Sequence, residues 1–322
     1  MNEMNEQTKK LLRLLIGKLR AGNLPPWRQP WNNSNEYIII GSMRYLVDQW
    51  PCNIRAPSMI YGVMNGILLR LAADMRGYKS NFWVSQKAIK ELNLKTRKGA
   101  EPVLINASYA GTDRRMFNVD QISNPQKSLG FAWSNDKIDM SSYMPKQYVK
   151  STKLLSKLKG EGLEIEYGGN RACYIPRLDK IKMPHLAQFV DKDKKEGEAL
   201  YWGVLWHEVV HWTGAPSRLD RTVGESFGDK QYAFEELIAE LGACLLCSHL
   251  HIKANIQSAS YVASWLKSAE NSDIKKEETH LYNLWADLLE DKFDVMTNAA
   301  EYAESAKQYV MEQATDQKKQ QQ

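Results

Sequence analysis

The sequence has few of the features that mark membrane, secreted or repetitive proteins. Among its 322 residues there is no apolar run of about 18 or more, so we expect no transmembrane helix. Four cysteines in a chain of this length do not suggest a disulfide scaffold. Residues 1–20 lack the long apolar stretch and the small-residue cleavage site of a signal peptide, so we expect a cytoplasmic protein with no membrane partner.

Charge is distributed unevenly along the chain, although the formal net charge is only +5. Residues 1–150 carry 22 Lys and Arg against 11 Asp and Glu, whereas residues 151–322 carry 21 against 27. The length is typical of about two domains. A basic first half favours a polyanionic partner, and the acidic second half does not. The alternative is that the asymmetry reflects chance variation in solvated surface charge.

Hydrophobic patterning in residues 1–125 predicts an α+β domain. Leucines recur at helical spacing near the N-terminus, and Ser85 is an N-cap candidate for a later helix. Alternating apolar residues predict two paired strands further along. The predicted elements are helices at 6–21 and 58–77, a helix that follows Ser85, and strands at 102–107 and 114–122.

The remaining sequence predicts a second, mainly helical domain. Residues 126–150 are rich in Asn, Ser, Pro and Lys, which indicates a linker or a peripheral excursion. Short alternating stretches predict a small antiparallel sheet with hairpin turns at Gly168–Gly169 and at 177–180. Helical patterning dominates from Glu198 onward, so the domain is expected over 151–310. The low-complexity tail 311–322 is predicted to be disordered.

The strongest local signal is the sequence HEVVH at residues 207–211. A spacing of four puts His207 and His211 on one face of a helix, so both rings can reach one metal ion. Glu208 follows the first histidine, where it can act as the general base for a water molecule. Gly214 is expected to end the helix. The motif predicts a Zn²⁺ site.

A third ligand is expected from the apolar helix QYAFEELIAELGACLL, which carries Glu235, Glu236 and Glu240. Carboxylates on a core helix are costly unless they are paired or bind a metal. We assign Glu236 as the ligand and Glu240, one turn further on, as the acceptor of a histidine N–H. The reverse assignment stays open. Glu235 lies about 100° away and is expected at the surface or as a cap. Ordinary salt bridges are the alternative for all three.

Three protein ligands leave one tetrahedral position open, which is typical of a catalytic site. The reaction expected is amide hydrolysis, with Glu208 accepting the proton of the attacking water. The stretch 171–175 could pair with an extended peptide. Cys244 and Cys247 form a C-x-x-C pair, which we interpret as core packing because the chain has no second such pair.

Positive charge and aromatic residues are interleaved in the first 120 residues. Single-stranded nucleic acids are bound by basic grooves with aromatic rings on which bases stack. No recognition helix typical of duplex readers is apparent. The alternative is that the tryptophans are core residues and the lysines decorate the surface. The candidate DNA-binding residues are Trp27, Arg28, Trp31, Tyr61, Lys79, Trp83, Lys87, Arg97 and Lys98.

Three motifs occur together in the chain: PPWRQPW, HEVVHWTGAPSRLDR and EELIAELGA. With them the chain resembles the ArdC-type antirestriction proteins, a family encoded mostly by plasmids and other mobile elements, over nearly its whole length. The first part resembles that family's single-stranded-DNA-binding domain, which some plasmid primases share. The second part resembles its zincin-like metallopeptidase domain. A further matching stretch, NIRAPSMIYGVMNG, adds Asn65 to the expected DNA-binding residues.

The resemblance implies a protein that binds single-stranded DNA and protects incoming DNA from host restriction. It also implies a zinc-dependent fold with peptidase activity, for which a host restriction protein or another host protein is the expected substrate. Carried over by motif, His207, His211 and Glu236 are the ligands and Glu208 is the catalytic acid/base. Asp220, in the SRLDR motif, is expected to brace the site by pairing with an Arg.

Two alternative functions remain. The first is a single-stranded-DNA-binding protein whose zinc site is only structural. The second is a plasmid replication or priming accessory. The presence of Glu208 favours catalysis, because a purely structural site does not need that carboxylate. No acidic metal cluster typical of primases is apparent in the sequence, which counts against the priming role.

Overall fold

The structure is a computed structural model, and it divides the chain into two compact units. Unit 1 comprises Met1–Leu15 and Pro30–Asp139, and unit 2 comprises Ile16–Gln29 and Met140–Gln322. The structure describes residues 5–23, 25, 37–40, 43–46, 50–106, 113–134, 144–190, 194–221, 230–252, 271–291 and 294–313. The predicted fold class, α+β with a first α+β part and a mainly helical second part, is confirmed.

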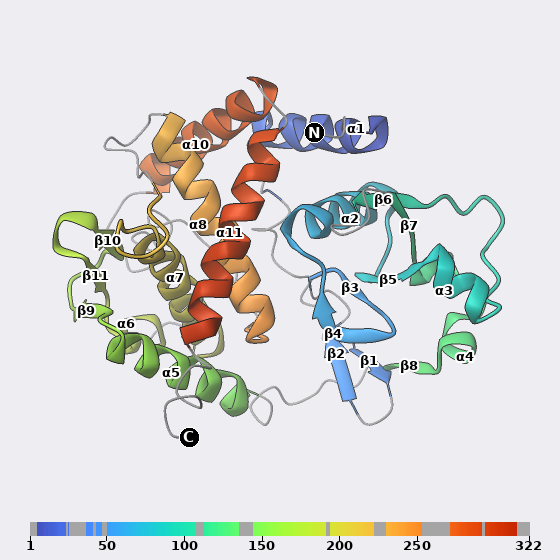
Figure 1. The fold of residues 1–322 in the computed structure, drawn as a ribbon, viewed down its shortest axis with the longest axis horizontal. Helices are drawn as coiled ribbons and strands as arrows, with labels where there is room; N and C mark the ends of the chain where they lie inside the picture. Colours follow the sequence, from blue (N-terminus) through green and yellow to red (C-terminus); the bar gives the residue numbers. More distant parts are fainter. Residues whose placement is uncertain are drawn as a thin grey trace. The chain divides into compact units, whose positions relative to one another are not determined.

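Unit 1 is built on a five-stranded sheet with the order β4-β3-β5-β7-β6 and a three-stranded sheet with the order β2-β1-β8 (Figure 1). Its strands are β1 (Tyr37–Ile40), β2 (Met43–Leu46), β3 (Cys52–Asn53), β4 (Ala56–Ile60), β5 (Phe82–Ser85), β6 (Val103–Asn106), β7 (Asp113–Asn118) and β8 (Phe131–Ser134). Its helices are α2 (Val63–Arg76), α3 (Gln86–Glu91), α4 (Pro125–Leu129) and the 3₁₀ turn η1 (Val119–Gln121), together with the first part of α1 (Glu6–Arg20).

Several predicted elements of unit 1 are confirmed. The N-terminal helix is α1, and the paired strands are β6 and β7, which run antiparallel. The second strand, predicted over 114–122, ends at Asn118, where η1 begins. Ser85 caps α3, and its side chain accepts a hydrogen bond from the Ala88 amide at 3.1 Å. The predicted helix at 58–77 begins later, at Val63, because residues 56–60 pair with β3 as strand β4.

The segment 126–150, interpreted from composition as a linker or excursion, contains elements of both units, and its last residues begin the helix Met144–Gly160 of unit 2. Its first residues belong to α4, and Phe131–Ser134 form β8, which pairs antiparallel with β1. A strand of four residues is too short to produce a periodic pattern against its polar surroundings. Composition therefore could not separate this strand from a linker.

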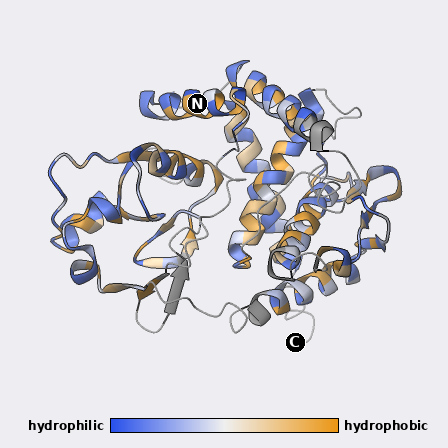
Figure 2. Cartoon of the chain, turned by 180° about the vertical axis from the view of Figure 1, so that it is seen from behind, coloured by the Kyte–Doolittle hydropathy of each residue, from blue (hydrophilic) through white to orange (hydrophobic). Residues whose placement is uncertain are grey.

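The core of unit 1 lies between the sheet and its helices. Figure 2 shows most of α2 in hydrophobic colours, and its Ile67, Leu69 and Leu71 are fully buried. The Trp50 indole N–H donates to the Tyr61 carbonyl at 2.8 Å, and its ring lies against Gly66. A Cβ atom at Gly66 would come within 2.3 Å of that ring, so only glycine allows this approach.

Unit 2 is mainly helical and carries one small sheet. Its α8 packs against α7 and α11 (Figure 1). Its helices are α5 (Met144–Gly160), α6 (Leu186–Val190), α7 (Lys194–Thr213), α8 (Lys230–His249), α10 (Asn271–Asp291) and α11 (Asp294–Gln313), with the 3₁₀ turn η3 (Pro176–Leu178). Its strands are β9 (Glu164–Tyr167), β10 (Cys173–Ile175) and β11 (Lys180–Met183).

The sheet of unit 2 is mixed, whereas the sequence predicts an antiparallel sheet with two hairpins. The hairpin at 177–180 is confirmed, because β10 and β11 are antiparallel across η3. The predicted hairpin at Gly168–Gly169 is wrong, since β9 pairs with β11 and runs parallel to it. The two glycines take positive φ angles and lead the chain past the central strand instead.

The C-terminal end of the predicted second domain also differs from expectation. Residues 311–313 complete α11, and the rest of the tail predicted to be disordered, 314–322, lies outside the described residues.

Within the described ranges, no helix is both long enough and apolar enough to cross a membrane. Cys244 and Cys247 are buried thiols on α8 that are not joined by a disulfide, in agreement with their interpretation as core residues.

Candidate metal centre

Helices α7 and α8 supply the candidate metal ligands because their buried faces meet at close range. On α7, Leu205, Val209 and Val210 are fully buried, which fixes the rotation of the helix. On α8, Gly242 faces Val210, and a Cβ atom there would lie 2.8 Å from the valine side chain. The small residue therefore lets the two helices approach closely enough for polar side chains to meet between them.

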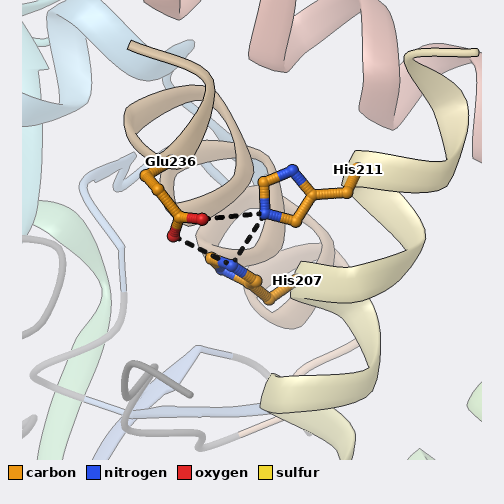
Figure 3. Close-up of side chains that lie close together, drawn as sticks. All are labelled: His207, His211 and Glu236. Carbon is orange, nitrogen blue, oxygen red and sulfur yellow. Dashed lines mark hydrogen bonds and ion pairs between the residues drawn. The ribbon is translucent and has the colours of Figure 1, made fainter. Parts of the chain in front are cut away.

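His207 and His211 project from α7 toward Glu236 on α8 (Figure 3). The two Nε2 atoms lie 3.1 Å apart. The Glu236 carboxylate oxygens lie 3.5 Å from the Nε2 atom of His207 and 3.5 Å from that of His211. A tetrahedral ion with metal–nitrogen distances of about 2.0–2.1 Å separates its ligand atoms by about 3.3 Å. The three donors are thus spaced to hold one ion.

Glu236, and not Glu240, is the carboxylate that the structure brings to the two histidines. Among the described residues, the group that could hold a metal is His207, His211 and Glu236. Glu240 is fully buried on the same helix, one turn further on. The geometry favours the first of the two assignments that the sequence left open.

The acceptor of the His211 ring N–H is Glu235, a role that the sequence pattern favoured for Glu240. The Glu235 carboxylate lies 3.3 Å from His211 Nδ1 and also accepts two hydrogen bonds from Arg221, at 2.9 and 3.2 Å. The prediction that Glu235 is a surface or cap residue is wrong, because its side chain is 3% exposed. Since α8 is buried on almost every side, a rotation of about 100° still points inward.

Arg221 also supports the last turn of α7. Its guanidinium donates to the Thr213 hydroxyl at 2.9 Å and to the Val210 carbonyl at 2.7 Å. Opposite charge and hydrogen bonding in a buried site of this kind orient a metal-binding imidazole and fix its tautomer.

His211 and Glu236 lie 3.5 Å apart, so each affects the pKa of the other. Burial disfavours the charged form of His211, but the carboxylates of Glu235 and Glu236 outweigh it and raise the pKa of His211 to about 10. Burial also opposes ionisation of Glu236, yet hydrogen bonds from the two histidines hold its pKa well below the usual range. The metal-free site therefore holds a proton that a metal ion would displace.

Glu208, the candidate proton acceptor, follows the candidate ligand His207 directly on α7. Its side chain is buried, and one oxygen, Oε2, accepts a hydrogen bond from the Tyr174 amide of β10 at 2.7 Å. Burial raises the pKa of Glu208 above its usual value, against the opposing effects of the histidines and the amide. A carboxylate of raised pKa is a better general base near neutral pH.

The SRLDR motif braces the site differently from the prediction. Asp220 is exposed, with its amide bonded to the Ala215 carbonyl at 3.1 Å, and it has no ion pair among the described residues. The two arginines of the motif form ion pairs with other carboxylates. Arg218 pairs with Asp179, and Arg221 pairs with Glu235. Asp220 itself has a left-handed φ of 47°.

Comparison with solved structures finds the same architecture in a plasmid-encoded protein. The antirestriction protein ArdC from plasmid R388, in its Mn(II)-bound form, matches with a TM-score of 0.63 and 27% identity. The match covers 97% of this chain and 99% of that one. The metal-free form matches with a TM-score of 0.60 and 26% identity. This chain is a structural relative of ArdC.

Sequence comparisons find matches in both units. A zincin-like metallopeptidase family model matches residues 153–277, and a model described as Trypanosoma Tc-38 (p38) protein matches residues 67–126. The uncharacterized protein y4eC of Sinorhizobium fredii (strain NBRC 101917 / NGR234) is 28% identical over 272 residues, which are 79% of this chain and 81% of y4eC.

Two sequences of the DNA primase TraC from Escherichia coli also match this relative of ArdC. They are 27% and 28% identical over 285 and 283 residues, and each match covers 81% of this chain. The matches cover only 18% and 25% of the TraC sequences. The similarity therefore concerns a small part of each primase.

The DNA-binding candidates of the chain fall into different environments. Trp27, Arg28 and Trp31 lie outside the described residues. Trp83 is fully buried in the core of unit 1, so the expectation that it stacks on a base is wrong. Its strand β5 lies between β3 and β7, and its sequence neighbours Phe82 and Val84 are fully buried with it.

The remaining candidates are more accessible. Tyr61 and Asn65 are half-buried, and the Tyr61 hydroxyl is enclosed. Lys79 and Lys87 are exposed, and Lys87 lies 3.7 Å from Glu91. Arg97 and Lys98 are exposed in the turn after α3, and in the sequence only their charge indicates them.

Proposed function

We propose that this protein protects the incoming DNA of a mobile element from host restriction, combining single-stranded-DNA binding in unit 1 with a metallopeptidase site in unit 2. The observation that carries the proposal is the cluster of His207, His211 and Glu236, with the buried carboxylate of Glu208 beside it. Similarity to ArdC over nearly the whole chain supports the antirestriction role. The partners proposed are single-stranded DNA and a host protein that the peptidase cleaves.

The ligand residues fit a divalent metal, and their chemistry suits Zn²⁺. His207 and His211 would bind through Nε2, and Glu236 through its carboxylate. The relative ArdC has a Mn(II)-bound structure, so both metals belong in any test. When bound, the metal supplies Lewis acidity toward a carbonyl group.

Glu208 performs the proton transfers in the proposed reaction. Its buried carboxylate accepts a proton from the attacking water and delivers it to the leaving amine. Glu235 and Arg221 hold the His211 ring so that Nε2 faces the other ligands. The result is hydrolysis of an amide bond, with no covalent intermediate on the protein.

The proposal is tested by replacing Glu208 with Gln, which keeps the size of the side chain and removes the base. We expect metal binding to persist at one ion per chain, while proteolysis and protection against an active restriction system fall by at least about 100-fold. The His207→Ala variant should bind no metal. Glu301→Gln on the exposed face of α11 is the matched control and should behave as the unmodified chain. Full protection by the Glu208→Gln variant would mean that the antirestriction role does not depend on peptidase chemistry.

Single-stranded-DNA binding is proposed to rest on exposed cations of unit 1. Arg97 and Lys98 offer two such charges in one turn, and neither forms an ion pair within the described part of the chain. The full chain should bind a single-stranded oligonucleotide more tightly than the same duplex at matched salt. Replacing both residues with Ala should lower the affinity and reduce the slope of log affinity against log salt by about 1–2. Equal affinity for the two oligonucleotides would refute the single-strand preference.

A second candidate is a DNA-binding accessory of replication whose metal site is structural. The observation that favours it is the similarity to TraC primases, which covers most of this chain. It differs from the main proposal in the Glu208→Gln experiment. A structural site predicts that this substitution changes neither metal content nor function.

A further inference from the structure

Tyr174 on β10 is held at both of its ends. Its backbone amide donates to Glu208 Oε2 at 2.7 Å, and its phenol donates to Asp179 Oδ1 at 2.8 Å. The strand is at the edge of its sheet, with β11 on one side only. Since the Tyr174 amide donates a hydrogen bond to Glu208, it points away from β11 and toward α7.

Asp179 is in turn fixed by a guanidinium group. Arg218 Nη1 lies 3.0 Å from Asp179 Oδ2, and Arg218 Nη2 bonds to Oδ1, so the pair is bidentate. The Arg218 guanidinium holds the pKa of Asp179 below its usual value. Asp179 follows η3 with a left-handed φ of 47°, a conformation that aspartate tolerates better than most residues. Its carboxylate is therefore aimed by the turn between β10 and β11.

Arg218 is anchored to the metal helix itself. Its Nε donates to the Trp212 carbonyl at 2.6 Å, and its guanidinium carbon lies 4.0 Å from the centroid of the Trp212 ring. Trp212 directly follows the candidate ligand His211, and the Arg218 side chain is only 8% exposed. Stacking and hydrogen bonding at a buried site leave the guanidinium little freedom.

These contacts form a closed chain that leaves α7 at Trp212 and returns to it at Glu208. We propose that Tyr174, Asp179 and Arg218 act together as a clamp that positions the carboxylate of Glu208 through the Tyr174 amide. The clamp residues are not among the candidate metal ligands, and they act on Glu208 through the Tyr174 amide, so they are positioning residues. The catalytic meaning of the clamp rests on the proposed function, whereas its effect on the Tyr174 amide does not.

The physical reason for such a clamp is the cost of a mobile buried carboxylate. A buried carboxylate needs hydrogen-bond donors, and an edge strand offers one only if the strand itself is held in place. With Oε2 occupied, Oε1 is the oxygen left to exchange a proton, and the base keeps one orientation. Without the clamp, β10 would be held on that side by the hydrogen bond from Tyr174 to Glu208 and by packing against α7.

The test measures hydrogen exchange of the Tyr174 amide in the full chain, by mass spectrometry that resolves single amides, without substrate. Tyr174→Phe removes only the hydroxyl, and Asp179→Asn removes only the charge. Each should accelerate exchange of this amide by about tenfold, while amides in the middle of α7 keep their protection. Glu208→Ala should accelerate it further. Tyr302→Phe, at an exposed position on α11, is the control and should change nothing at Tyr174.

The combination of variants separates a clamp from general loosening. The Tyr174 hydroxyl, Asp179 and Arg218 belong to one hydrogen-bonded network, so the variant that combines Tyr174→Phe with Asp179→Asn should exchange no faster than the faster single variant. Unchanged Tyr174 exchange in both single variants would overturn the proposal, as would unchanged exchange in Glu208→Ala. Because no substrate is present, these results stand whether or not the chain cleaves a protein.

Discussion

Replacing Glu235 with Gln tests the buried pair that supports the candidate metal ligand His211. Glu235 and Arg221 are each 3% exposed and share two hydrogen bonds, so the substitution leaves a guanidinium buried without its counter-ion. Removing one partner of a buried ion pair costs about 3–5 kcal/mol of unfolding free energy. Because Gln can still accept one hydrogen bond, we expect a loss at the lower end, about 3 kcal/mol. The weaker acceptor at His211 Nδ1 should also lower metal affinity by about 10–100-fold.

The loss of stability is measured by urea unfolding of the metal-free chain, and the loss of affinity by calorimetric titration with Zn²⁺ and Mn²⁺. Glu301→Gln, at an exposed position, is the control and should change the unfolding free energy by less than about 0.5 kcal/mol. A loss below about 1 kcal/mol for Glu235→Gln is the size expected of a surface pair. Such a result would refute the assignment of Glu235 as a buried partner of Arg221 and His211.

Two further predictions concern helix packing and pH. Gly242→Ala should destabilise the chain by about 1–3 kcal/mol in urea melts, because its Cβ would meet Val210 at 2.8 Å; Gly17→Ala, with open space around it, should not, and equal effects would contradict the close approach. His211 has its pKa raised from 6.5 to about 10, so its contribution to stability is complete below about pH 6.5 and is lost toward pH 10. The unfolding free energy of the metal-free chain should therefore fall over that range, and a flat profile would refute the charged form of His211.

Local patterns in the sequence determined the elements and the pair of histidines. A spacing of four residues places His207 and His211 on one helical face wherever that helix lies, because the geometry is internal to the helix. The cap of α3 at Ser85 follows from the same kind of local chemistry. The paired strands β6 and β7 are close in the chain, so their alternating pattern was sufficient to predict them.

Contacts between distant segments were decided only by the tertiary structure. The position of Glu235 beside His211 depends on which sides of α8 are covered, and the hydrophobic residues of α8 surround the helix without marking one face. Trp83 lies in the sequence between two lysines, Lys79 and Lys87, each four residues away, yet its strand lies between two others and its side chain is fully buried. The parallel pairing of β9 with β11 is likewise a choice between strands that alternation cannot distinguish.

The sequence by itself thus determined that a helix with two histidines four residues apart and a carboxylate-bearing helix exist, because helical periodicity is encoded within each segment. Only the tertiary structure decided that Glu236 faces the histidines, that Arg221 turns to Glu235, and that Tyr174 reaches Glu208. The physical reason is that a side chain's partner depends on the packing angle and rotation of two elements. Those are set by the burial of all their apolar residues together, and no single motif carries that information.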